Sequence, residues 1–172
     1  MLKPIILVAL LSSIAPSFAG VYDELEFGDD RKTVTSKLHD SQIVTGASSD
    51  SIFGNVGLNG IFKCNQKLAD LSYSLYFGWE KDGLSQITLR SDHLAQNEYY
   101  TDIQTAWKEA VKLLDTVYDS PKLQNNYPSQ FKHNQDGIIF SHTWEVDEST
   151  VVMLGTGKVE DHYFLAIRFA KP

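Results

Sequence analysis

The chain has 172 residues, a formal net charge of −7 and an apolar content of 42%. The acidic balance and the lack of any cluster of Lys and Arg argue against nucleic acid as a partner, because a polyanion is bound by grouped positive charges. Cys64 is the only cysteine, which excludes an intrachain disulfide and a thiolate metal cluster. Its apolar surroundings predict a buried thiol, with an intermolecular disulfide or a reactive thiol as the alternative.

Residues 1–19 are typical of a secretory signal peptide. Lys3 supplies a short positive region, an apolar run begins at Ile5, and the stretch Ser17-Phe18-Ala19 places small residues where signal peptidase reads them. The apolar run is too short to cross about 30 Å of hydrocarbon. We therefore expect cleavage after Ala19, a periplasmic or secreted protein, and no transmembrane segment after that cleavage.

The stretch LEFGDDRKTVTSKL predicts the start of a helix. Asp29 or Asp30 can cap the unpaired N–H groups of a first turn, and both acids favour its positive end. Val34 and Leu38 then fall four residues apart on one face, so a short helix is expected from about 30–40. The alternative is that the two aspartates form a metal site or an acid–base pair.

Three strands are expected after a loop at 41–59. The first covers 60–64, and the turn EKDG joins the second, 71–80, to the third, 84–91, as a hairpin. The second strand alternates between its two faces, which is the pattern of a half-buried strand. The apolar face of this strand carries Leu71, Tyr73, Leu75, Phe77 and Trp79.

The second half repeats this order. Apolar residues at steps of three and four predict an amphipathic helix at 97–118, and a polar loop follows at 122–136. Three further strands are expected at 138–146, 149–157 and 162–169. Within the first of them, alternation places Phe140, His142 and Trp144 on one face.

The two halves align at an offset of 77 residues. Val34 and Val111 lie on the apolar faces of the two helices at this spacing, and "GIFKC" aligns with "GIIFS" at the start of a strand. We therefore predict an α+β fold of tandem αβββ repeats, 20–94 and 95–172, in one joint domain. The helices are expected to pack on one face of an antiparallel sheet of about six strands.

A short motif carries a family resemblance. Phe27, Gly28, Arg31 and Val34 match the F-G-x-x-R-x-x-V pattern that opens a repeat of the β-lactamase inhibitor proteins, and the element order resembles exported modules of the BamE/SmpA type. The inhibitor family pairs cysteines within its repeats, whereas Cys64 is alone here. The resemblance implies a secreted, non-enzymatic binding scaffold.

No catalytic motif is found. The chain lacks a G-x-S-x-G nucleophile elbow and an H-E-x-x-H zinc helix, and "GTGK" predicts a hairpin turn because no helix follows it. No two of the five histidines have the spacing of metal ligands on one element. We expect no catalytic residue, no metal and no cofactor.

Helices can cover only one face of the predicted sheet, so the other face stays in contact with water. That face is either an ordinary solvated surface or a shallow polar binding surface. We expect the partner to be a protein or an envelope component. The alternatives are a small-ligand carrier or small enzyme with a helix–sheet pocket near Trp107, His142 and Trp144, and a structural envelope protein. The residues expected on the outer face are Ser72, Ser74, Tyr76, Ser141, Thr143 and Glu145.

Overall fold

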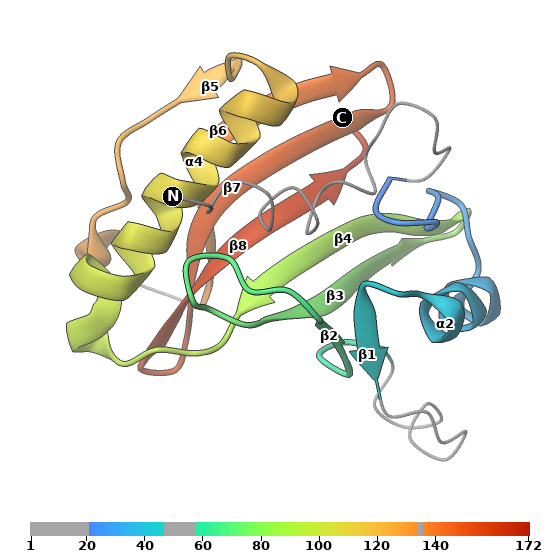
Figure 1. The fold of residues 1–172 in the computed structure, drawn as a ribbon. Coiled ribbons are helices and arrows are strands. Elements are labelled where there is room, and N and C mark those ends of the chain that lie inside the picture. Colours follow the sequence, from blue (N-terminus) through green and yellow to red (C-terminus); the bar gives the residue numbers. More distant parts are fainter. Residues whose placement is uncertain (1–20, 47–57, 134–135) are drawn as a thin grey trace, which may run out of the picture.

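A computed structural model describes residues 21–46, 58–133 and 136–172 and shows an α+β fold (Figure 1). Its antiparallel sheet has the strand order β1-β2-β3-β4-β8-β7-β6-β5. The strands are β1 (Val44–Gly46), β2 (Phe62–Cys64), β3 (Tyr73–Glu80), β4 (Gly83–Ser91), β5 (Leu123–Gln124), β6 (Gly137–Asp147), β7 (Thr150–Val159) and β8 (His162–Ala170). The helices are α2 (Arg31–Asp40) and α4 (Gln104–Tyr118), with one-turn segments at Gln96–Glu98, Tyr99–Ile103 and Gln130–Lys132.

The sheet is larger than the sequence predicts. The described chain contains eight strands rather than about six, because β1 and β5 are added at the two edges. Both fall in segments that were expected to be loops. Each is only two or three residues long, too short for any alternation of apolar and polar residues to be recognised.

The second helical segment begins irregularly. The sequence predicts one helix at 97–118, but a 3-10 turn and a π-helical turn, Tyr99–Ile103, precede α4. The wider turn changes which residues face the sheet, and both Tyr99 and Ile103 are buried. From Gln104 onward the helix is regular, and its apolar side packs on the sheet as predicted.

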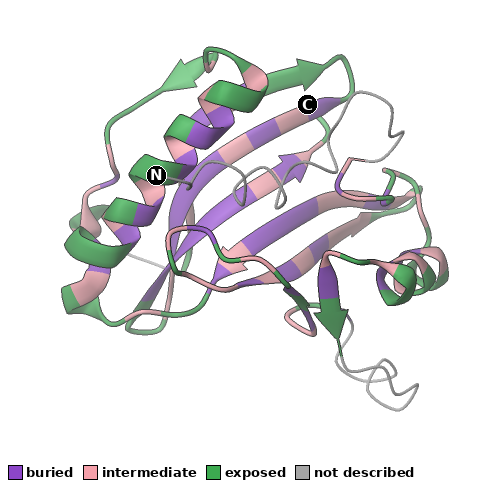
Figure 2. Cartoon of the chain, in the orientation of Figure 1, coloured by how far each residue is buried: buried purple, intermediate pink, exposed green. Residues whose placement is uncertain are grey.

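Both helices pack on the same face of the sheet, here called the inner face. Val34 and Leu38 of α2 join one continuous apolar core with Ala106, Ala110 and Leu114 of α4. Figure 2 shows buried positions along the strands and on the side of α4 that is turned toward them. The strand residues in this core include Tyr73, Leu75, Phe77, Ile87, Leu89, Trp144, Val152, Leu154, Leu165, Ile167 and Phe169.

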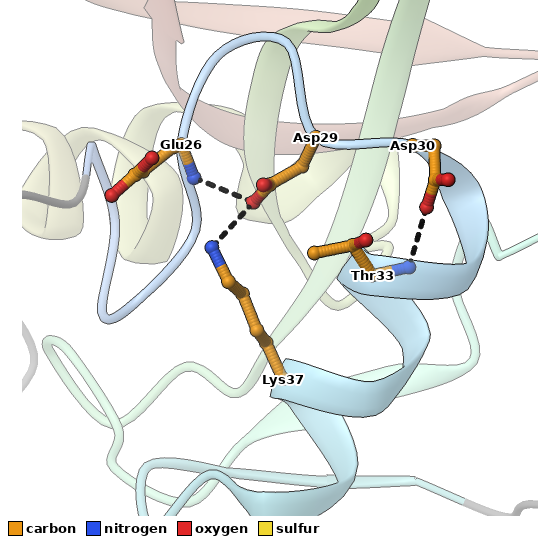
Figure 3. A network of polar contacts seen from close by, with 5 residues as sticks. All are labelled: Glu26, Asp29, Asp30, Thr33 and Lys37. Carbon is orange, nitrogen blue, oxygen red and sulfur yellow. Dashed lines mark hydrogen bonds and ion pairs between the residues drawn. The ribbon is translucent and has the colours of Figure 1, made fainter.

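The paired aspartates at the start of α2 cap and brace the helix (Figure 3). Asp30 is the N-cap, and its carboxylate accepts a hydrogen bond of 2.7 Å from the N–H of Thr33. That bond holds the pKa of Asp30 below its ordinary value. Asp29 accepts from the N–H of Glu26 at 2.9 Å and forms an ion pair of 2.9 Å with Lys37. The capping prediction is therefore confirmed.

The turn before α2 is joined to the β3–β4 hairpin. The N–H of Gly28 donates to the carbonyl of Leu84 at 2.8 Å, and the N–H of Leu84 donates to the carbonyl of Asp29 at 2.8 Å. Gly83 lies against this turn, and a Cβ there would stand 2.3 Å from the carbonyl oxygen of Gly28. The hairpin thus fixes the position at which α2 starts.

Removing the N-cap should destabilise the fold measurably. Asp30→Ala deletes the acceptor for the Thr33 N–H and should lower the free energy of unfolding by about 1 kcal/mol. Urea denaturation measures the change. The control is Asp40→Ala at the other end of α2, where loss of an acid beside the negative helix end should leave stability unchanged or slightly raised. Equal losses in both variants would contradict the capping role.

Candidate functional site

The outer face of the sheet, opposite α2 and α4, carries a group of polar and aromatic side chains. The strand register brings them into two neighbouring rows, because residues that pair across antiparallel strands point to the same face. The first row is Ser74, Arg90, Ala166, Gly155 and Phe140, and the second row is Tyr76, Thr88, Arg168, Met153 and Thr143.

Arg90 lies between two aromatic rings on this face. Its guanidinium carbon is 4.2 Å from the ring centroid of Tyr76 and 5.2 Å from that of Phe164. Its Nε is buried and has no hydrogen-bond partner among the described residues. Partial burial disfavours the charged form and lowers the pKa of Arg90, although Tyr76 opposes this shift. Arg90 is therefore a desolvated cation with an unsatisfied donor.

Arg168 occupies the neighbouring position. Its guanidinium lies over the ring of Phe140, 4.8 Å from the centroid, and its Nε donates to the hydroxyl of Thr88 at 3.1 Å. Thr88 is completely buried, so this bond holds Arg168 at the sheet surface. Burial, and then the nearby charge of Arg90, lower the pKa of Arg168.

The two arginines are diagonal neighbours. Arg90 pairs with Ala166, and Arg168 pairs with Thr88, on either side of the pair Leu89–Ile167 in the β4–β8 ladder. Such diagonal positions are about 7–8 Å apart. The ion pairs in the described chain, Lys37–Asp29 and Lys122–Glu145, include neither arginine. Two like charges thus share one part of the outer face without a carboxylate.

Histidine rings border the same area. The ring of His93 lies 5.6 Å from that of Phe164 and 6.5 Å from that of His162. Phe164 itself is 1% exposed, and its ring fills the space above Gly157. The two arginines therefore pack on aromatic rings and small residues, and His93 and His162 lie next to them at one end of the sheet.

Most of the residues predicted for the outer face lie there. The register places Ser74, Tyr76, Thr143 and Glu145 on it, with Glu145 near the β5 edge in an ion pair with Lys122. Ser72 lies just before β3, and its carbonyl accepts the N–H of Asp92. That these residues bind a partner remains a prediction.

The placement of Ser141 and Phe140 was predicted incorrectly. A β-bulge between Phe140 and His142 breaks the alternation of β6. As a result, the hydroxyl of Ser141 lies on the inner face, where it accepts a hydrogen bond of 2.8 Å from the indole N–H of Trp107. Phe140 lies on the outer face beneath Arg168, rather than beside His142 and Trp144.

The trio Trp107, His142 and Trp144 comes together as the sequence suggested. The ring of His142 lies 5.3 Å from Trp107 and stacks on Trp144 at 5.5 Å, and its Nδ1 is 3.1 Å from the Ser141 hydroxyl. Trp144 donates to Asp115 of α4 at 3.1 Å. These contacts hold α4 against β6.

A second buried polar cluster was not anticipated. The hydroxyl of Tyr99 donates to the carbonyl of Pro128 at 2.9 Å and lies 3.1 Å from His133 Nε2 and 2.9 Å from the hydroxyl of Thr156. These four residues come from separate parts of the chain, so their sequence spacing predicts nothing. The cluster fastens the segment after α4 to the inner face of β7.

Cys64 has the environment of a packing residue. It is buried, and its sulfur lies 3.4 Å from the hydroxyl of Tyr22. Burial raises the pKa of the Cys64 thiol to about 11. Because the thiolate is the nucleophilic form, this thiol is poorly suited to react near neutral pH. The prediction that Cys64 is buried is confirmed.

Within the described ranges, no three His, Cys, Asp or Glu side chains are placed to hold a metal ion. The helices there are also too short or too polar to cross a bilayer. Comparisons with protein-family models, with curated proteins and with solved structures each found no match. The functional assignment therefore rests on the residues themselves.

Stability should fall on mild acidification. Burial lowers the pKa of both His133 and His142 from 6.5. The unfolded chain therefore binds more protons as the pH falls below about 6.5, so stability present at neutral pH is lost toward the folded-state pKa values. Urea denaturation across this range should show the decline, and His142→Phe should make it shallower. A decline that is as steep in His142→Phe as in the unmodified chain would contradict the assignment.

Proposed function

We propose that the chain is an exported, non-enzymatic binding module that recognises a protein or another envelope component with the outer face of its sheet. The observation that carries this proposal is the pair Arg90 and Arg168, half-buried on that face and unpaired with any described carboxylate. A desolvated, uncompensated charge costs stability. Its presence on a face that neither helix covers is characteristic of a surface that meets a ligand.

The scaffold beneath this face is rigidly held. Hydrogen bonds from Trp107 to Ser141 and from Trp144 to Asp115 connect α4 to β6, and Tyr99 connects its first turns to β7. Elements of this kind position a recognition surface with little loss of conformational entropy on binding. The same packing does not favour the alternative of a ligand pocket near His142, which is 1% exposed.

Export is supported by the charge and apolar pattern of residues 1–19 and by the resemblance to secreted modules. Expression of the full chain with a C-terminal tag in a Gram-negative host should yield a periplasmic or secreted product whose N-terminus is Gly20. Mass spectrometry of the purified product measures the cleavage point. A cytoplasmic product that retains Met1 to Ala19 would contradict export.

We propose also that the two halves arose by duplication. Each half contains a helix and four strands, of which the first is a short edge strand, and the halves meet where β4 pairs with β8. The offset of 77 residues relates Tyr73 at the start of β3 to Thr150 at the start of β7. This supports the predicted tandem αβββ arrangement, 20–94 and 95–172.

Site-specific photo-crosslinking tests the outer face as the recognition surface. A crosslinking amino acid replaces Ser74 or Thr143, which share this face at opposite sides of the arginine pair. After incubation with an envelope extract, both positions should give the same adduct, and excess unlabelled protein should abolish it. The matched controls replace Lys108 or Lys112, which are exposed on α4.

The controls decide between specific recognition and general adhesion. Adducts restricted to Ser74 and Thr143 support an outer-face partner. Adducts that form equally well from Lys108 and Lys112, or that excess unlabelled protein does not compete away, would contradict it. Because neither labelled position belongs to the arginine pair, the result does not depend on the chemistry that those arginines recognise.

A further inference from the structure

On the basis of the proposed function, we propose that Arg90 and Arg168 form a binding site for one oxyanion, a carboxylate or a phosphate, carried by a small ligand with an apolar or aromatic body. The proposal goes beyond recognition by the outer face in general, because it names the two residues and the chemistry that they take.

The electrostatics of the outer face favour an anion between the arginines. Arg90 and Arg168 are diagonal neighbours in the β4–β8 ladder, so their charges repel at a distance where water screens them incompletely. Lys63 pairs with Ser74 on the same face and adds a third positive charge two strands away from Arg90. Glu145, an acid of this face, is already engaged by Lys122, and no described carboxylate forms an ion pair with either arginine. An anion that contacts both guanidinium groups would relieve this repulsion.

The hydrogen-bond donors are arranged for such a contact. A guanidinium that lies over an aromatic ring contacts the ring with its planar face. Its N–H groups point outward in that plane and remain available to a ligand. The Nε of Arg90 is buried and that of Arg168 donates to Thr88, so the Nη groups of the two arginines are the donors left for a ligand. Carboxylate and phosphate oxygens match the fork of such donors, and charge assistance strengthens each bond.

The surroundings favour a ligand with an apolar part. The partly exposed rings of Tyr76 and Phe140 lie against Arg90 and Arg168, whereas Phe164 is 1% exposed and offers a ligand no surface. Met153 pairs with Arg168 in the register and extends the apolar area toward β6. A ring or short alkyl chain attached to the anion would cover this surface and exclude water from the arginine contacts.

The charge of the whole protein favours a small anion over an acidic polymer. The formal net charge is −7, so the positive charge of this area is a local exception on an acidic protein. A long polyanion would extend beyond Arg90, Arg168 and Lys63 and meet repulsion. A compact ligand with a single anionic group places its charge only where the protein is positive.

Arginine side-chain NMR of the full chain gives a direct test, since the sequence contains only three arginines. The probes are benzoate and phenyl phosphate, which carry a ring, and acetate and inorganic phosphate, which do not. The Nε–H signals of Arg90 and Arg168 should shift until the site is saturated. The Nε–H signal of Arg31, a residue of α2 that lies over the ring of Trp79, should not shift. The tighter of the two ring-bearing probes identifies the preferred oxyanion.

Matched variants test the geometry separately from the charge. Arg90→Lys and Arg168→Lys keep the charge but lose the planar fork, and each should weaken binding of the better probe by about tenfold or more. Arg31→Lys should leave the affinity unchanged. Thermal unfolding of each variant confirms that it is folded, and the titration of the unmodified chain stands independently of all of them.

Two results would overturn the proposal. One is a uniform, non-saturating shift of all three arginine signals, which would indicate ionic screening only. The other is undiminished probe binding by the double variant Arg90→Lys/Arg168→Lys. Outer-face crosslinks combined with either result would support the binding module and contradict the oxyanion site. Saturable binding of a probe without a crosslinked partner would support the oxyanion site and contradict the binding module.

Discussion

The pairing of β4 with β8 is the constraint on which the rest of the structure depends. It joins the two halves of the sheet, and it places Ile87 opposite Phe169 on the inner face, under the helices. Because side chains alternate along a strand, the same register puts Arg90 and Arg168 on the outer face. A slip of one residue would turn one of the two strands over, burying its arginine and exposing its apolar residues.

The energies explain why this register is selected. Burying one Ile, Leu or Phe side chain contributes about 1.5–3 kcal/mol, and several such residues line each strand. Burying an unpaired guanidinium under the helices would cost several kcal/mol in addition. On the outer face the same group is only partly desolvated, and its ring contacts offset about 0.5–2 kcal/mol of that cost. The apolar core therefore also sets the positions of the two outer cations.

Much of the fold follows from local patterns in the sequence. The N-cap at Asp30 and the alternation in 71–80 and 162–169 each predict a nearby element, and the structure contains them. The edge strands β1 and β5 are too short to leave such a pattern. The bulge after Phe140 is set by the pairing with β7, so alternation within β6 alone assigned Ser141 to the wrong face.

The arginine pair required tertiary information. Arg90 and Arg168 each stand near the end of a strand with an otherwise clear pattern, where a single charge on the polar face is ordinary. Only the β4–β8 register shows that they are diagonal neighbours, and only the side-chain contacts show that no described carboxylate meets them.

The position of the pair also bears on the proposed duplication. Arg90 and Arg168 are 78 residues apart, close to the offset of 77 that relates the halves. In the ladder, Arg90 opposes Ala166 just as Arg168 opposes Thr88, so a two-fold axis between β4 and β8 would exchange the two arginines. A carboxylate has its own two-fold axis and can meet two such donors equivalently. Thr88 accepts a hydrogen bond from Arg168, whereas Ala166 has no hydroxyl that could accept one from Arg90. Arg168 is therefore held in place, and Arg90 can adjust its position.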